Sequence, residues 1–339
     1  MYKSVTAIFL ALLMLCPAFG NSAAYAARPA APATQTADAL LQMLPDCDGF
    51  IAVDFARVSG QIQSLTAQRA DLTAKLRTQL NRMASLAGVP LESASQVVLS
   101  FSASNAPQRS QLVILLSGAF NQEEILARLA QESGKTWKAK KYKGQRIYVD
   151  PAKSKPKNAR TSIAFFDNQT VVAFGPNRDV KRVIDVRAGA QSGASQNAAL
   201  MAAYQQTDAS ASIRFAFLVP EALRQWLATA TGQAALLRPL AAVTQVSGTI
   251  DLNESGLTAL VSLLTGTPDE AAAVVNLINM GLVMVKLALG DSPEAELLLA
   301  ILNGVSAMQA GNVANVTVNV PAELIQRLIE KYGSRAPRG

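Results

Sequence analysis

The sequence predicts an α+β protein in which helices cover antiparallel β-sheets. Short apolar runs with two-residue alternation, such as residues 97–102, predict strands. Longer stretches with apolar residues three and four positions apart predict amphipathic helices. Both kinds of pattern follow the order β-α-β-β-α-β-β-α, once from residue 49 and again from residue 212. We therefore expect a tandem duplication of this unit.

The first α+β repeat is expected over residues 39–189. Apolar residues at helical spacing predict an amphipathic helix over residues 59–87. A capping box from Asn121 to Glu124 predicts the start of a second helix, because both side chains can accept from free backbone amides. A third helix is expected over residues 177–188. The predicted strands of this repeat are residues 49–55, 97–102, 112–116, 136–142, 146–150, 161–166 and 170–174.

The second α+β repeat is expected over residues 197–333. A stretch rich in Gly, Ser, Ala and Gln, residues 189–197, is the seam between the repeats. Pro220 is expected as the first residue of a helix. A capping box from Thr267 to Glu270 predicts the start of the next helix. The remaining predicted elements are the strands 213–217, 246–252, 257–264, 305–309 and 313–320 and a last helix over 321–331.

The apolar stretch 271–289 is long enough to suggest a membrane span. Asn276, Asn279 and Lys286 interrupt it, and a charge in the bilayer costs a few kcal/mol. The sequence therefore favours a helix buried in the folded protein, and we expect no transmembrane span in the mature chain. The alternative is that this helix and residues 297–302 line a cavity for an apolar ligand.

The first 26 residues have the pattern of a cleavable signal peptide. An apolar run over residues 5–15 is about half the length of a membrane span, and small residues at 24 and 26 fit a signal peptidase. A large residue precedes Cys16, which disfavours a lipid anchor there. Residues 27–38 form an Ala/Pro/Thr tether that cannot bury a core. We expect an exported protein, periplasmic or secreted.

Composition removes several chemistries. The chain has no histidine, which excludes Ser-His-Asp and Cys-His catalysis and the common zinc sites. Once the signal is removed Cys47 is the single cysteine, so no intramolecular disulfide can form, and a buried thiol is expected. Chemistry based on paired carboxylates remains open. No motif indicates a catalytic, metal or cofactor site, and the expected protein is not an enzyme.

Basic charge is concentrated in residues 135–160. This segment has ten Lys and Arg residues against Asp150 alone, a net charge of +9, whereas the whole chain carries +7. Trp137, Tyr142 and Tyr148 lie among these charges, as in a surface that contacts phosphates or sugars. The alternative is an edge strand kept soluble by lysines. The candidate anion-binding residues are Lys138, Lys140, Lys141, Lys143, Arg146, Lys153, Lys155, Lys157 and Arg160.

Three short motifs suggest a family. Each lies at a turn beside a predicted strand, and the resemblance that they carry covers most of the mature chain. The motifs are Leu44-Pro45, Tyr142-Lys143-Gly144 and Phe166-Asp167-Asn168. They resemble an uncharacterised family of exported bacterial proteins, a domain of unknown function. The resemblance implies no activity and no site residues.

The leading functional hypothesis is a non-enzymatic exported binding or interaction protein that contacts an anionic envelope component through residues 135–160. The partner would be an anionic lipid, a polysaccharide or an acidic protein, and no specific nucleic acid is expected. No cofactor is expected. The alternative is a carrier of an apolar ligand under the helices at 271–302. A carboxylate-based enzyme is the third hypothesis.

Overall fold

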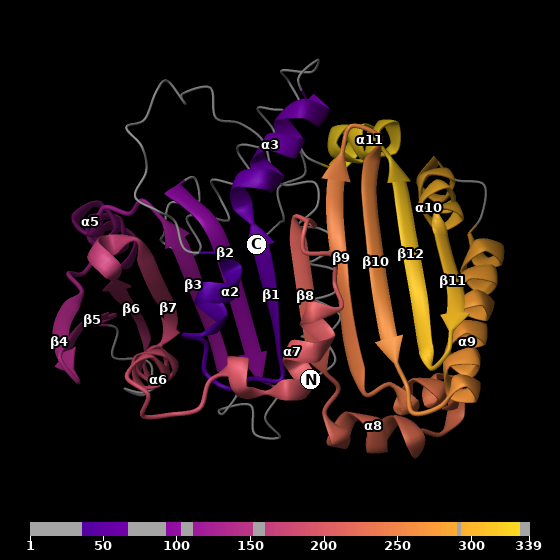
Figure 1. Cartoon of the computed structure of the whole chain (residues 1–339). Helices are drawn as coiled ribbons and strands as arrows, with labels where there is room; N and C mark the ends of the chain where they lie inside the picture. Colours follow the sequence, from indigo (N-terminus) through magenta and orange to yellow (C-terminus); the bar gives the residue numbers. More distant parts are fainter. Residues whose placement is uncertain (1–35, 67–92, 103–110, 152–159, 290–292, 333–339) are drawn as a thin grey trace.

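The structure is a computed structural model and describes residues 36–66, 93–102, 111–151, 160–289 and 293–332. Twelve strands in these residues form one antiparallel sheet, and the α+β class is confirmed (Figure 1). The strand order is β11-β12-β10-β9-β8-β1-β2-β3-β7-β6-β5-β4. The predicted separate sheets are therefore replaced by one continuous sheet.

The middle of the sheet is the antiparallel pair of β1 (Gly49–Asp54) and β8 (Ile213–Leu218), in which Ile51 lies opposite Phe215. The strands on the β1 side are β2 (Ala94–Ser102), β3 (Gln111–Gly118), β7 (Val171–Pro176), β6 (Thr161–Phe166), β5 (Gln145–Val149) and β4 (Lys138–Tyr142). The strands on the β8 side are β9 (Gln245–Asn253), β10 (Gly256–Leu264), β12 (Val313–Pro321) and β11 (Val305–Ala310).

The two halves place their strands in the same outward order. From the middle, β1, β2, β3, β7 and β6 correspond in chain order and in position to β8, β9, β10, β12 and β11. The hairpin β4–β5 is an addition of the first half and forms its outer edge. The predicted hairpins at 97–116 and 246–264 thus take matching places in the sheet, while the tandem duplication stays a prediction.

Helices lie on both faces and around the rim of the sheet. The α-helices are α2 (Ala37–Leu41), α3 (Phe55–Thr66), α5 (Gln122–Ser133), α6 (Asn177–Arg187), α7 (Ala198–Gln205), α8 (Glu221–Ala228), α9 (Pro268–Ala288), α10 (Pro293–Asn303) and α11 (Ala322–Tyr332). Three 3-10 segments are η4 (Asp167–Gln169), η5 (Ala194–Gln196) and η6 (Gly232–Ala242). Of the predicted helix 59–87, residues 67–87 lie outside the described residues.

Side-chain caps begin two of these helices as predicted. The side chain of Asn121 accepts from the amides of Glu123 and Glu124, and Thr267 and Glu270 form a complete capping box. Helix α8 begins one residue later than predicted. Pro220 is the N-cap of α8 rather than its first residue, because its ψ of 137° is extended rather than helical.

Two hydrophobic clusters lie on opposite faces of the sheet. Alternation along β1 places Phe50 with α2, α6 and α7 on one face and Ile51 with α3 and α5 on the other. The cluster around Ile51 includes Leu252 of β9 and Ile325 of α11, so it extends across both halves. The β1–β8 pair therefore joins the halves through backbone hydrogen bonds and through a shared core.

The prediction that the helix at 271–289 is buried is wrong. Helix α9 contacts β11 and β12 and buries only Ala271, Val274 and Val275. Because β11 is the last strand, the sheet supports α9 on one side only. Among the described helices, α9 alone has the length and hydropathy of a membrane span, with a mean hydropathy of 1.8 and 11% of that window buried.

Candidate functional site

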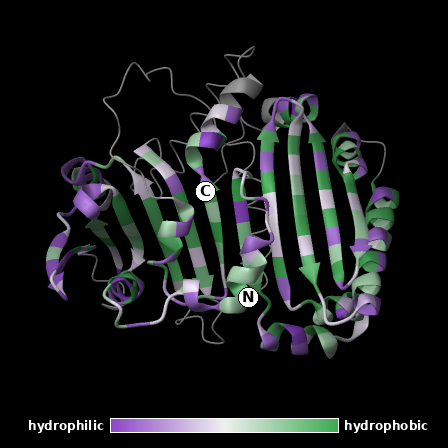
Figure 2. Ribbon diagram, viewed as in Figure 1, coloured by the Kyte–Doolittle hydropathy of each residue, from purple (hydrophilic) through white to green (hydrophobic). Residues whose placement is uncertain are grey.

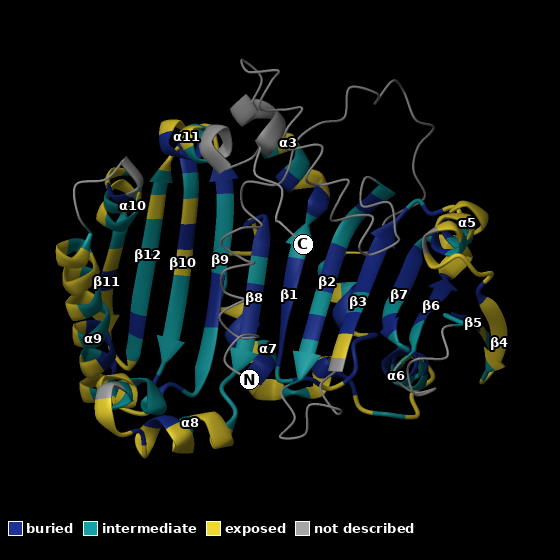
Figure 3. Cartoon of the chain, turned by 180° about the vertical axis from the view of Figure 1, so that it is seen from behind, coloured by how far each residue is buried: buried dark blue, intermediate teal, exposed yellow. Residues whose placement is uncertain are grey.

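The strongest concentration of charge lies on β4, the outermost strand of the first half. Lys138, Lys140 and Lys141 are all exposed, and β4 pairs only with β5 (Figure 3). Among the described residues, no carboxylate forms an ion pair with these three lysines. We call Lys138, Lys140, Lys141 and the neighbouring Arg146 the basic edge.

The basic edge presents cations on both faces of the sheet. Lys140 lies opposite Ile147, which belongs to the cluster under α6, so Lys138 and Lys140 share that face. Lys141 lies directly opposite Arg146 on the other face. Like charges in directly opposed positions destabilise a strand pair by a few tenths of a kcal/mol to about 1 kcal/mol. An anion bound between them would relieve this repulsion.

The β4–β5 turn carries a charge that is already paired. The ammonium group of Lys143 lies 2.6 Å from Oδ1 of Asp185 on α6, and the hydroxyl of Tyr142 donates to both oxygens of Asp185 at 3.1 Å. The hydrogen bond with Asp185 raises the pKa of Lys143, while desolvation and the same carboxylate raise the pKa of Tyr142. Lys143 therefore forms an intramolecular ion pair, and we do not include it in the basic edge.

Helix α6 adds a cation that sequence analysis missed. The ammonium group of Lys181 lies 4.9 Å from the centre of the Tyr142 ring. The spacing of Arg178, Lys181 and Arg182 at three and four residues marks a basic helical face and was a usable signal. Lys181 therefore extends the positive surface from β4 onto the helix.

The other predicted site residues are dispersed or undescribed. Arg160 immediately precedes β6, so β5 lies between it and β4. Lys153, Lys155 and Lys157 lie outside the described residues. Trp137 and Tyr148 are buried, whereas Tyr142 is half-buried. The prediction that Trp137 and Tyr148 belong to a binding surface is wrong, since their rings complete the core around α5.

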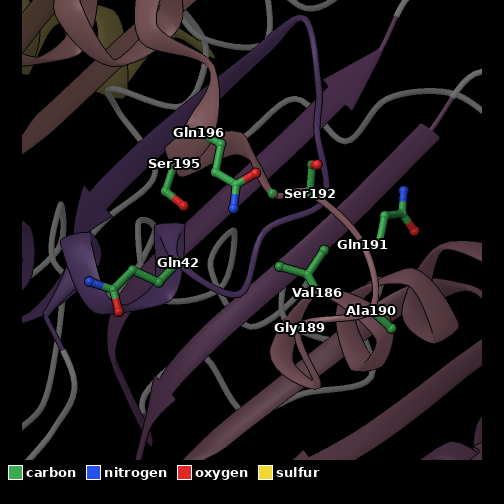
Figure 4. Close-up of a pocket in the computed structure, with 9 residues that line it drawn as sticks. Gln42, Val186, Gly189, Ala190, Gln191, Ser192, Ser195 and Gln196 are labelled. Atoms are coloured by element: carbon green, nitrogen blue, oxygen red, sulfur yellow. The ribbon is translucent and has the colours of Figure 1, made fainter.

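A polar groove lies at the seam between the halves (Figure 4). Its volume is about 520 Å³. The seam is held in place, because the amide of Ala194 donates to the carbonyl oxygen of Leu44 at 2.9 Å. The lining residues are Gln42, Val186, Gly189, Ala190, Gln191, Ser192, Gly193, Ser195 and Gln196. These groups can hydrogen-bond a ligand, but none of the nine supplies a carboxylate, thiol or amine for acid–base chemistry.

One network of partly buried polar groups serves the fold. Asp251 accepts from the amide of Gln61 at 2.9 Å and from the hydroxyl of Ser212 at 2.6 Å, which ties α3 to β9. Within the described residues, no group of three or more Cys, Asp or Glu side chains is arranged to hold a metal ion. Cys47 is buried as predicted, and burial raises the pKa of its thiol to about 12.

Apolar side chains are exposed at the opposite end of the sheet. Apart from Leu112, the large apolar residues exposed in the described chain lie between residues 223 and 308. Figure 2 shows α9 apolar over much of its length. These residues are Leu223, Trp226, Leu236, Leu237, Leu260, Met280, Val283, Met284, Val285, Leu287, Leu298 and Met308. The apolar stretch at 271–289 is evident in the sequence, whereas its exposure is not.

Fold and site define an α+β protein with one large antiparallel sheet, a basic edge and an apolar far end. The chain belongs to the family described as "Protein of unknown function (DUF3352)", whose sequence model matches residues 63–283. This confirms the resemblance to an uncharacterised family. Among curated proteins, no sequence matches this chain.

Among solved structures, the chain is similar to crystal forms of TP0453. For crystal form I the identity is 10% and the TM-score 0.44, and the match covers 86% of this chain and 96% of that one. For crystal form IV the identity is 11% and the TM-score 0.45, with 89% and 98% covered. At this level of similarity, nothing about a ligand of this chain follows.

Proposed function

We propose that this chain is a non-enzymatic exported binding protein that contacts an anionic envelope component through the basic edge. The observation that carries the proposal is the exposure of Lys138, Lys140 and Lys141 with no carboxylate paired to them among the described residues. Paired lysines, such as Lys143, are less available to a ligand because Asp185 already neutralises them.

Protection of an exposed sheet edge is the competing explanation for these lysines. One charge pointing each way would suffice for that role. The strand pair instead sets Lys141 against Arg146, an arrangement that costs stability without adding protection. This cost favours a role in binding.

The chemistry of the edge favours phosphate, carboxylate or sulfate groups over nucleic-acid bases. Proteins that bind single strands stack bases on exposed aromatic rings. Here Trp137 and Tyr148 are buried, and Lys181 lies over the ring of Tyr142. An anionic lipid, a polysaccharide or an acidic protein therefore fits better than a nucleic acid.

The proposal that the protein is not an enzyme has its own support. The groove at the seam lacks titratable side chains among its nine lining residues. The buried carboxylate of Asp179 accepts from Arg178 at 3.1 Å within the first turn of α6. A carboxylate-based enzyme would need two acids converging on an accessible cavity.

The test compares two variants of the chain recovered from the cell. K138E/K140E/K141E reverses the charges, and K138R/K140R/K141R keeps them. We expect the wild type and the Arg variant to bind phosphatidylglycerol-containing vesicles or an acidic polysaccharide, with release as salt rises toward about 0.5 M. The Glu variant should not bind, with an unchanged melting temperature, since exposed charges contribute under about 1 kcal/mol each.

A wild type that shows no salt-sensitive retention on any anionic surface would contradict the proposal. Sequencing the amino terminus of the recovered chain tests export at the same time. We expect it to begin at Ala27, whereas an intact Met1 would contradict a cleaved signal.

The carrier of an apolar ligand is the second candidate function. The observation in its favour is the apolar surface of α9, although α9 contacts the sheet edge directly through Val274 and Val275. Lipid that co-purifies in stoichiometric amount, detected by mass spectrometry, would support this candidate.

We also propose that the two halves arose by tandem duplication. The support is the shared outward strand order on either side of β1 and β8. Superposing β1, β2, β3, β7 and β6 on β8, β9, β10, β12 and β11 tests the proposal. Strands that match in order but not in direction or spacing would contradict it.

A further inference from the structure

The outer surface of helix α9 is apolar over its last turns, after the exposed Asn276 and Asn279. Met280, Met284 and Leu287 lie at four- and three-residue spacing with Val283 beside Met284, and all four are exposed, Leu287 to 81%. Exposed apolar helix surface of this kind is normally covered by protein or by lipid. The sheet encloses only the side of α9 that carries Val274 and Val275.

The apolar surface continues from α9 onto its neighbours. Helix α8 contacts η6, and η6 contacts α9, so the three elements form one side of the molecule. Leu223 and Trp226 of α8 and Leu236 and Leu237 of η6 are exposed on them. We call the exposed apolar residues of α8, η6 and α9 the apolar end. Exposed apolar surface that extends over several elements marks an interaction site.

Charged residues flank the apolar end. Glu221, Asp269 and Glu270 lie in the first turns of α8 and α9, Arg224 pairs with Glu221, and Arg238 and Lys286 are the other basic residues of the three elements. Lys286 is half-buried, a state in which a lysine stem can cover apolar surface while the ammonium group reaches water. Trp226 and Lys286 are the residue types that proteins place at the level of lipid headgroups.

A second copy of the chain fits this surface less well than lipid does. A stable dimer buries about 800 Å² on each partner with close shape complementarity. The exposed stripe of α9 covers two turns, and the other apolar residues lie on elements of different direction. A fluid bilayer accepts apolar side chains in any register and needs no matching shape.

We propose that the apolar end rests on the surface of a phospholipid bilayer, with Met280, Val283, Met284 and Leu287 among the acyl chains. Helix α9 lies in the interface rather than across the membrane, because it follows β10 closely in the chain and packs against β11 and β12. This contact is independent of the basic edge, since β4 and β11 are the two outermost strands of the sheet.

The test measures flotation with neutral phosphatidylcholine vesicles, using the chain recovered from the cell with its amino terminus determined. The variant M280Q/V283Q/L287Q makes the stripe polar. The matched control is M308Q, because Met308 is 70% exposed but alternates with Ala307 under α9 and so lies on the other face of β11. We expect the stripe variant to lose at least about tenfold in partitioning and the control to keep wild-type binding.

A second measurement does not depend on any variant. Trp137 is buried and Trp226 is exposed, so vesicles should shift the emission of Trp226 to shorter wavelength. Flotation and the shift should persist at high salt, unlike binding through the basic edge, and K138E/K140E/K141E should leave both unchanged.

Three outcomes would overturn the proposal. The first is a wild type that neither floats nor shifts its emission. The second is a stripe variant that floats like the wild type. The third is a wild type that is dimeric without vesicles and a stripe variant that is monomeric, which would assign the surface to a second copy.

Discussion

Arg187 donates from its two terminal guanidinium nitrogens to both carboxylate oxygens of Asp167, at 3.1 and 2.5 Å. This contact closes a turn in which three consecutive residues have left-handed backbone, with φ of 49° at Asp167, 52° at Asn168 and 68° at Gln169. The turn also positions α5, because the side chain of Gln169 accepts from the amide of Gln122 at 2.8 Å. Backbone strain is thus retained where it fixes the start of a helix.

Substitution of Asn168 isolates this strain, because its side chain is exposed. Asn168→Val should lower the free energy of unfolding by about 1 to 2 kcal/mol, since a β-branched residue tolerates this backbone poorly. Asn168→Gly should be neutral or stabilising by less than about 1 kcal/mol. Urea unfolding of both variants measures the difference, and equal midpoints would show that the turn is not strained.

The thiol of Cys47 gives a pH dependence with a defined sign. Desolvation raises its pKa from 9.0 to about 12 in the folded chain, and Asp46 and Asp48 contribute in the same direction. The neutral thiol therefore stabilises the fold fully below pH 9, and this contribution is lost as the pH rises from 9 toward 12. The difference in unfolding free energy between wild type and Cys47→Ala should shrink across that range.

Thiol labelling provides the control for this prediction. In a Cys16→Ser background, Cys47 should react with an aromatic disulfide reagent only after unfolding, because the thiol is buried and protonated. Rapid labelling of the native chain at neutral pH would contradict both statements.

The β1–β8 pair predicts that neither half is stable alone. A fragment of residues 39–189 leaves one edge of β1 unpaired and exposes Ile51, which lies opposite Phe215 in the whole chain. Exposed apolar strand edges promote association. Size-exclusion chromatography with light scattering should find this fragment aggregated or oligomeric.

Co-expression with residues 197–333 supplies the missing strand. A soluble one-to-one complex of the two fragments is the expected result. A monomeric, natively folded fragment 39–189 would instead show that the halves are independent domains.

Much of the fold was predictable because strands and caps are local features. The alternation in residues 97–102 and the caps at Asn121 and Thr267 identified β2, α5 and α9 directly. The joining of β1 to β8 was not predictable, since their pairing depends on residues more than 150 positions apart. The periodicity of apolar residues also cannot distinguish a buried helix from an exposed one. For this reason the sequence predicted burial for α9.

The concentration of positive charge at the candidate site was predictable from the sequence, but the contacts of its side chains were not. A count of basic residues in 135–160 found the basic edge, whereas the pairing of Lys143 with Asp185 requires α6 to pack beside β4. The spacing of basic residues on α6 marks Lys181 in the sequence, but its position beside Tyr142 depends on the same packing. The turn at Asp167 and Asn168 was expected, but Gln169 has no intrinsic preference for left-handed backbone, so its conformation follows from tertiary contacts.

Because one uninterrupted sheet links β4 to β11, the distance between these two strands is fixed. Eleven strand-to-strand steps of about 4.8 Å place its two outermost strands about 50 Å apart, measured along the twisted sheet. Hydrogen bonds connect every step, so this separation cannot change through a hinge between the halves. With both proposed contacts made, the sheet would set the distance between the ligand of the basic edge and the lipid surface under the apolar end.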